Sequence, residues 1–161
     1  MAPPPRWSMF PDHHSEVADL LEEDNLYFTF HHGDKETGHI KGYDTNVMGR
    51  FQCPNPNYNE QGWSSKKIAV WIRLYSGKRY NARVFHQRCK SCNWVSRPTL
   101  DDSYAERVAY RLKKWSNVEV ERPFYGGKKG KPHKSELCEG CKNGHCAEGD
   151  LEELMGSLSL F

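Results

Sequence analysis

The chain has 161 residues, of which 37% are hydrophobic, a mean hydropathy of −0.87 and a formal net charge of +2. These values predict one domain with a thin apolar core, and the longest central apolar run, Ile68–Ile72, excludes a membrane-spanning helix, which needs ~20 residues. The N-terminus has no basic stretch followed by an apolar one, so no secretory signal is predicted and we expect a cytoplasmic or nuclear protein.

Short elements are predicted before the first cysteine. In chain order they are a disordered stretch 1–14, a helix from its cap Ser15 to Glu23, a strand Leu26–His31, a turn-rich connection 33–46 and a strand Val47–Cys53. The helix and the first strand belong to an N-terminal segment, residues 15–46, that we expect to pack on the core.

The clearest strand signal is the alternation of aliphatic and other side chains over Lys66–Tyr75. A turn at 76–79 leads to a second alternating strand, Tyr80–Gln87, so the two predict an antiparallel hairpin. A helix is then predicted from Asp101 or Asp102 to Trp115, with an acidic N-cap and apolar residues spaced by three or four. The fold class predicted from these elements is α+β, a small and mostly antiparallel sheet with one or two helices, stapled by zinc.

Positive charge is concentrated in the middle of the chain. Residues 1–61 carry 4 basic and 10 acidic side chains (net −6), residues 62–134 carry 18 and 5 (net +13), and residues 135–161 carry 1 and 6 (net −5). The basic block 62–134 could bind the phosphates of a nucleic acid, or it could pair with the acidic flanks of the same chain. On the first interpretation the candidate nucleic-acid-binding residues are Arg83, Arg88, Lys90, Lys128, Lys129 and Lys131.

The cysteines occur at spacings typical of zinc sites. Cys89 and Cys92 form a CxxC pair, which places two thiolates on one tight turn. A second cluster, with the spacing His-x4-Cys-x2-Cys-x4-Cys, supplies enough ligands for a complete site and consists of His133, Cys138, Cys141 and Cys146. In a reducing compartment such cysteines remain thiols, so metal is favoured over a disulfide-stapled secreted domain.

Two catalytic interpretations of the cysteines are weaker. A redox CxxC normally begins a helix in a βαβ context, which the predicted elements lack. Catalytic zinc needs an open coordination position and an acid or base beside it, and the sequence contains no HExxH motif. We therefore expect structural zinc, one or two ions per chain, and no enzyme activity.

Five segments carry a family resemblance. They are GRFQCPNP (Gly49–Pro56), GWSSKKIAVWI (Gly62–Ile72), HQRCKSC (His86–Cys92), ERVAY (Glu106–Tyr110) and HKSELCEGCKNGHC (His133–Cys146). Together they resemble the three-CxxC (3CxxC-type) zinc-binding domain that is shared by receptor-transporting proteins, zygote arrest proteins and uncharacterised fungal proteins. The resemblance spans residues 47–146 and leaves 147–161 as an acidic C-terminal tail.

The resemblance implies a set of zinc ligands and one gap in it. The implied ligands are Cys53, Cys89, Cys92, His133, Cys138, Cys141 and Cys146. The family pattern has a further cysteine three positions after the first, where this chain has Pro56. Cys53 with Cys89 and Cys92 would give only three thiolates. The fourth ligand could be His86, which is the first candidate, or His145, a more distant histidine or water; otherwise this site is weak or empty.

The resemblance also implies two functions of different classes. Zygote arrest proteins, together with the basic block, imply a zinc finger-like module that binds nucleic acid, RNA rather than DNA. Receptor-transporting proteins imply instead a protein–protein interaction or membrane-receptor trafficking adaptor.

Overall fold

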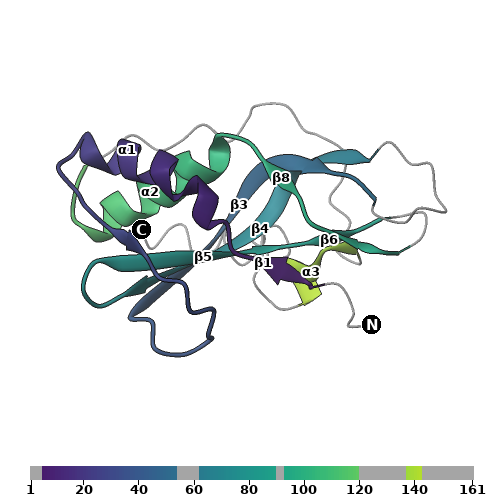
Figure 1. The fold of residues 1–161 in the computed structure, drawn as a ribbon, viewed down its shortest axis with the longest axis horizontal. Helices are drawn as coiled ribbons and strands as arrows, with labels where there is room; N and C mark the ends of the chain where they lie inside the picture. Colours follow the sequence, from purple (N-terminus) through teal and green to yellow (C-terminus); the bar gives the residue numbers. More distant parts are fainter. Residues whose placement is uncertain (1–4, 54–61, 90–92, 120–136, 143–161) are drawn as a thin grey trace, which may run out of the picture.

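The computed structural model describes residues 5–53, 62–89, 93–119 and 137–142. Two helices lie on one side of a curled, mostly antiparallel sheet, which confirms the predicted α+β class (Figure 1). The helical elements are η1 (Pro11–His13), α1 (His14–Glu22), α2 (Ser103–Trp115) and α3 (Glu139–Lys142). The strands are β1 (Trp7–Ser8), β2 (Thr29–Phe30), β3 (Lys41–Phe51), β4 (Trp63–Tyr75), β5 (Arg79–Phe85), β6 (Gln87–Arg88), β7 (Val95–Ser96) and β8 (Thr99–Leu100).

The β4–β5 hairpin is the centre of the larger sheet, as the alternation predicted. The sheet has the order β1-β5-β4-β3-β8, with β2 added in parallel to β5, and β6 pairs with β7 in a separate two-stranded sheet. Pairs such as Val70 with Val84 and Ile72 with Ala82 place aliphatic side chains on the same face of both strands. Because side chains of a strand alternate between faces, this register sets the whole apolar face against the helices.

Strand β3 begins six residues earlier than Val47, inside the segment that was predicted to be turn-rich. It pairs with β4 along its length, from Lys41 opposite Leu74 to Phe51 opposite Trp63. Gly42, which suggested a turn, instead allows a close approach, because a Cβ there would lie 2.9 Å from Nε1 of Trp71. Pairing with a long neighbour therefore outweighs the low strand propensity of the segment. The strand predicted over 26–31 is reduced to β2.

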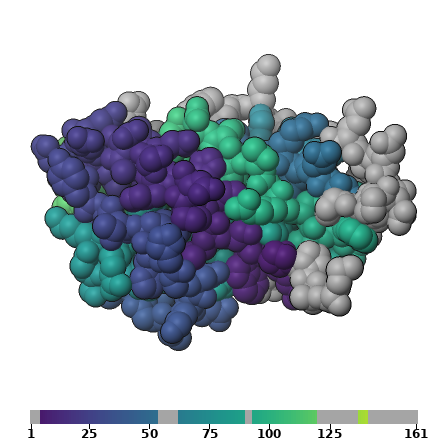
Figure 2. Space-filling view, viewed as in Figure 1, coloured from purple at the N-terminus to yellow at the C-terminus, as the bar shows by residue number. Residues whose placement is uncertain are grey.

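The N-terminal residues also differ from the expectation of disorder. Residues 1–4 lie outside the described residues, but Trp7 pairs with Phe85 through β1, and Phe10 is buried. Helix α1 starts at His14 directly after η1, and no side-chain hydrogen bond caps it, so Ser15 is not its cap. The space-filling view shows this purple N-terminal part of the chain lying across the visible face of the molecule (Figure 2).

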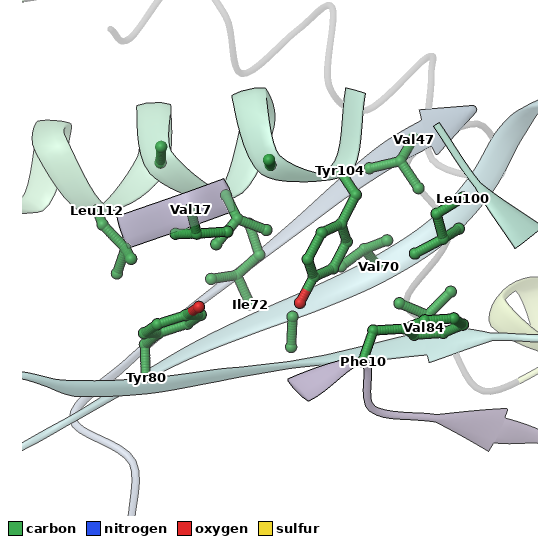
Figure 3. Close-up of a cluster of buried hydrophobic side chains, with 14 of the residues drawn as sticks. Phe10, Val17, Val47, Val70, Ile72, Tyr80, Val84, Leu100, Tyr104 and Leu112 are labelled. Carbon is green, nitrogen blue, oxygen red and sulfur yellow. The ribbon is translucent and has the colours of Figure 1, made fainter. Parts of the chain in front are cut away.

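The apolar core lies between the two helices and the sheet. Val17 from α1 and Leu112 from α2 lie over Ile72 and Tyr80, and Tyr104 reaches down towards the sheet from the first turn of α2 (Figure 3). Helix α2 starts where predicted, since the carboxylate of Asp101 accepts hydrogen bonds from the amide (2.9 Å) and hydroxyl of Ser103. No helix among the described residues is long and apolar enough to cross a membrane.

The opposite face of β4 and β5 carries buried charge. Asp34, in the connection between β2 and β3, accepts hydrogen bonds from Nη2 of Arg73 at 2.7 Å and Nη2 of Arg83 at 2.9 Å. The guanidinium of Arg83 also lies 4.3 Å from the ring centre of Trp7. Partial burial alone raises the pKa of Asp34, but the hydrogen bonds from the two arginines outweigh it, and the net result is a pKa below the ordinary value of 3.8.

Replacing Asp34 with Asn is expected to lower the free energy of unfolding by about 3 kcal/mol at pH 7, because Arg73 is fully buried and would lose the carboxylate that pairs with it. Because the folded-state pKa lies below the unfolded one, the contribution of Asp34 is present above pH ~4 and is lost as the pH falls further. Urea unfolding of both proteins at pH 7 and pH 3 measures this difference.

The matched control is Glu36→Gln, since Glu36 also pairs with Arg83 at 3.2 Å but its side chain is 69% exposed. We expect the control to change stability by less than about 1 kcal/mol. Equal losses in the two variants would contradict the account of a buried pair.

Candidate metal centre

Cys89 lies at the turn that joins β6 to β7. Its amide donates to the carbonyl of Trp94 at 2.8 Å, and its own carbonyl accepts from the amide of Asn93 at 2.7 Å. Asn93 takes a positive φ of 63°, a conformation that asparagine tolerates and that tight turns use. Cys89 therefore begins a tight turn between two short strands, and Cys92 lies outside the described residues.

The C-terminal cysteine segment lies against the other edge of β6. Gln87 forms an antiparallel bridge with Cys138, in addition to its pairing with Ser96 of β7. The amide of Glu139 donates to the carbonyl of His86 at 3.2 Å. Cys138 and Cys89, which are almost fully buried, are thus brought by backbone pairing to neighbouring positions, even though 49 residues separate them in the sequence.

An ion pair joins the two cysteine segments. Nε of Arg88, the residue before Cys89, donates to Oε1 of Glu139 at 2.5 Å, and Nη1 donates to the carbonyl of Asn93 at 3.0 Å. The Glu139 side chain is completely buried, and that of Arg88 is 18% exposed. Arg88 therefore holds both the turn after Cys89 and the residue after Cys138. The sequence offered a signal for this pair, since Arg88 and Glu139 each adjoin a cysteine of a CxxC, but it did not indicate that they meet.

The side chain of Gln87 connects this region to the start of β4. Its carbonyl accepts from the indole of Trp63 at 3.1 Å, and its amide group donates to the hydroxyl of Ser65 at 3.1 Å. Trp63 in turn stacks on Phe51 with 5.1 Å between ring centres. Phe51 ends β3, two residues before Cys53, so the chain leading to Cys53 is attached to the same end of the sheet.

The structure describes only part of the predicted ligand set. Cys53, Cys89 and Cys138 are buried, and no disulfide joins any two of these three. Within the described ranges no three His, Cys, Asp or Glu side chains form a group that could hold a metal. Cys92, His133, Cys146 and the alternative ligand His145 lie outside those ranges, and Cys141 is placed in α3 without a described side chain.

His86 is not available as the replacement ligand. A carbonyl can only accept, so the ring donates from Nδ1 to the carbonyl of Pro5 (2.8 Å), and Nε2 accepts from the hydroxyl of Ser8 (2.7 Å). Burial lowers the pKa of His86 to about 4, despite the Pro5 hydrogen bond, which favours the charged form. The ring is therefore neutral at pH 7 and fastens the N-terminal residues to the chain before Cys89.

Two of the predicted nucleic-acid ligands are used inside the protein. Arg83 is buried and pairs with Asp34 and Glu36, and Arg88 pairs with Glu139. For these side chains the alternative interpretation is correct, because the basic block pairs with the acidic flanks. The other four candidates, Lys90, Lys128, Lys129 and Lys131, lie outside the described residues.

The described donors fit zinc. Thiolates are among the ligands that zinc prefers, and two cysteines on one short turn can place both thiolates on one ion. The charged and hydrogen-bonded neighbours Arg88, Glu139 and Gln87 form the outer layer that orients such ligands.

Comparison with known proteins agrees with this donor set. A family model described as a zinc-binding domain, the 3CxxC zinc ribbon, matches residues 46–144. No curated protein and no solved structure shows significant similarity to the chain. The family match confirms the resemblance that the motifs predicted and implies Zn²⁺ as the bound metal.

Replacing His86 with Ala is expected to leave the zinc content per chain unchanged, because neither ring nitrogen is free to bind metal. The variant should instead lose about 1–3 kcal/mol of stability and be cut faster by trypsin after Arg6, whose carbonyl accepts from the His86 amide at 2.8 Å. Elemental analysis and a timed digest measure the two effects. A fall in zinc content with unchanged digestion would show that His86 is a ligand after all.

Proposed function

We propose that zinc in this chain, which belongs to the 3CxxC zinc-ribbon family of zinc-binding domains, is structural and that Cys89, Cys92, Cys138 and Cys141 share one ion. The observation that carries this proposal is the bridge between Gln87 and Cys138, which sets one CxxC segment beside the other. In each segment the second cysteine follows the first by three residues, so each pair offers two thiolates from one turn.

A shared ion would replace contacts that this part of the fold lacks. The described strands β6 and β7 have two residues each, and α3 has four, so they bury little apolar area of their own. When bound, zinc supplies four strong bonds between segments that are distant in the sequence, and that binding energy is folding energy. Arg88, Glu139 and Gln87 hold the two segments in the relative position that the ion requires.

This division of ligands has two consequences. Four thiolates complete a tetrahedral shell and leave no position open for a substrate, so we propose that the module has no catalytic activity. Cys53, His133 and Cys146 are then left as the candidates for a second ion, in place of the alternative in which Cys53 joins Cys89 and Cys92.

Zinc stoichiometry of single and double variants tests the shared ion. Cys89→Ser and Cys138→Ser should each lower the zinc content by one ion per chain, and the double variant should lose no more than either single variant. Elemental analysis after gel filtration measures the content, with Cys53→Ser in each background as the control for the second site. If the double variant loses two ions where each single variant loses one, Cys89 and Cys138 belong to different sites.

For the biological ligand of this module we propose single-stranded nucleic acid, RNA rather than DNA. The support is the net charge of +13 in residues 62–134. Among the described residues, Arg73, Arg83, Arg88 and Lys113 form internal ion pairs, and the whole block contains 18 basic side chains. Three of the other lysines, Lys128, Lys129 and Lys131, fall within four consecutive positions of a glycine-containing stretch of the sequence, which we propose binds successive phosphates.

The zinc-loaded chain is expected to bind a labelled single-stranded RNA at low salt, with an affinity that falls by orders of magnitude between about 50 and 200 mM salt. Reversing charge at Lys128, Lys129 and Lys131 together should abolish binding. Filter binding measures both effects. The matched control reverses three exposed lysines elsewhere, Lys35, Lys66 and Lys78, and should retain most of the affinity.

Two outcomes contradict the nucleic-acid proposal. Equal losses in the two triple variants would show that only net charge matters. A wild-type chain that ignores RNA and retains a defined protein partner would favour the adaptor function instead.

A further inference from the structure

An aromatic and basic patch lies where the start of β3 meets the last turns of α2. The Tyr43 patch consists of Tyr43, Tyr110, Arg111 and Lys114. The guanidinium carbon of Arg111 lies 3.4 Å from the ring centre of Tyr43 and 5.8 Å from that of Tyr110, and Nζ of Lys114 lies 5.8 Å from the Tyr110 ring centre. Tyr43 is 39% exposed and Lys114 is exposed, so the patch faces solvent.

Arg111 and Lys114 differ from the cations of the fold that form ion pairs. Arg73, Arg83 and Arg88 each bind a carboxylate, and Lys113, next to Lys114 in the chain, binds Asp24 at 2.8 Å. Within the described ranges, by contrast, neither Arg111 nor Lys114 forms an ion pair or hydrogen bond, and the buried Nε of Arg111 has no acceptor. Among the described residues, Arg111 and Lys114 therefore have no carboxylate partner.

The stacking of Arg111 prepares it for a ligand. A guanidinium held against the face of an aromatic ring has already lost much of its side-chain freedom, so less entropy is lost when its N–H groups bind an anion. Arg111 and Lys114 are three residues apart on α2 and therefore project from neighbouring positions of the helix. The two cations and Tyr110 on α2, together with Tyr43 on β3, offer charge and stacking surfaces side by side.

We propose that the Tyr43 patch binds single-stranded nucleic acid, with Arg111 and Lys114 on phosphates and the exposed ring of Tyr43 stacked on a base. An acidic peptide would use the cations but gain little from the rings, whereas every base has a face that stacks on an aromatic side chain. This inference rests on the proposed nucleic-acid function but assigns a contact to side chains of the described residues, which Lys128, Lys129 and Lys131 are not.

Fluorescence anisotropy with a labelled oligouridine and the full, zinc-loaded chain at low salt tests the proposal. Arg111→Gln is expected to weaken binding about tenfold and to reduce the salt dependence by about one phosphate contact. Tyr43→Ala should weaken binding at least fivefold, as removal of one stacking contact does. Tyr43→Phe keeps the ring and should bind like the wild type.

The matched charge control is Lys78→Gln, since Lys78 is exposed in the β4–β5 turn and should change the affinity less than twofold. Circular dichroism of each variant, with Tyr43→Phe as the reference, separates loss of binding from loss of fold.

Each contrary outcome is informative. If Arg111→Gln and Tyr43→Ala bind like the wild type while the triple variant at Lys128, Lys129 and Lys131 does not, the nucleic-acid function stands and the Tyr43 patch is not its site. If poly-glutamate of equal charge competes as well as unlabelled oligouridine, the ligand is an acidic chain rather than a nucleic acid. If the wild type does not bind oligouridine at all, the proposed function and this inference both fail.

Discussion

Strand β6 is the constraint on which the cysteine centre depends. After Phe85 the chain leaves the larger sheet, and Gln87 is then paired on one edge with Ser96 and on the other with Cys138. The backbone of Gln87 thus pairs with β7, which follows the turn at Cys89, and with Cys138 at the start of the second cysteine segment. Its side chain forms hydrogen bonds with Trp63 and Ser65 of β4. Without β6 in this position the two cysteine pairs would have no common support, because so little apolar area is buried by the short elements around them.

Buried and partly buried arginines in this protein are neutralised by acidic residues from the two flanks of the basic block. The acidic connection before β3 neutralises Arg73 and Arg83, and Glu139 neutralises Arg88 at the cysteine centre. A buried guanidinium without a carboxylate would cost several kcal/mol of stability. The main role of these pairs is therefore to stabilise the fold, not to bind a ligand. Arg111 and Lys114 on α2, which have no carboxylate partner among the described residues, are then cations through which an anionic ligand could be recognised.

Much of the fold could be predicted from local patterns, and the errors have physical causes. The β4–β5 hairpin and α2 have strong periodicities that the structure retains. The early start of β3 and the ordering of Trp7 depend on partners far along the chain, which propensity does not register. The family and its metal could be predicted because cysteine spacing is itself a chemical constraint. The roles of Arg83, Arg88 and His86 could not, since each is decided by a carboxylate, carbonyl or hydroxyl distant in sequence.

The most direct test of the shared site is ¹¹³Cd NMR of the cadmium-substituted protein, in which scalar couplings connect each metal to the β-protons of the cysteines that bind it. The account predicts that one cadmium resonance, in the range of tetrathiolate sites, couples to Cys89, Cys92, Cys138 and Cys141. A resonance that couples to Cys89 and Cys92 together with Cys53, and a separate one that couples to Cys138 and Cys141, would contradict it.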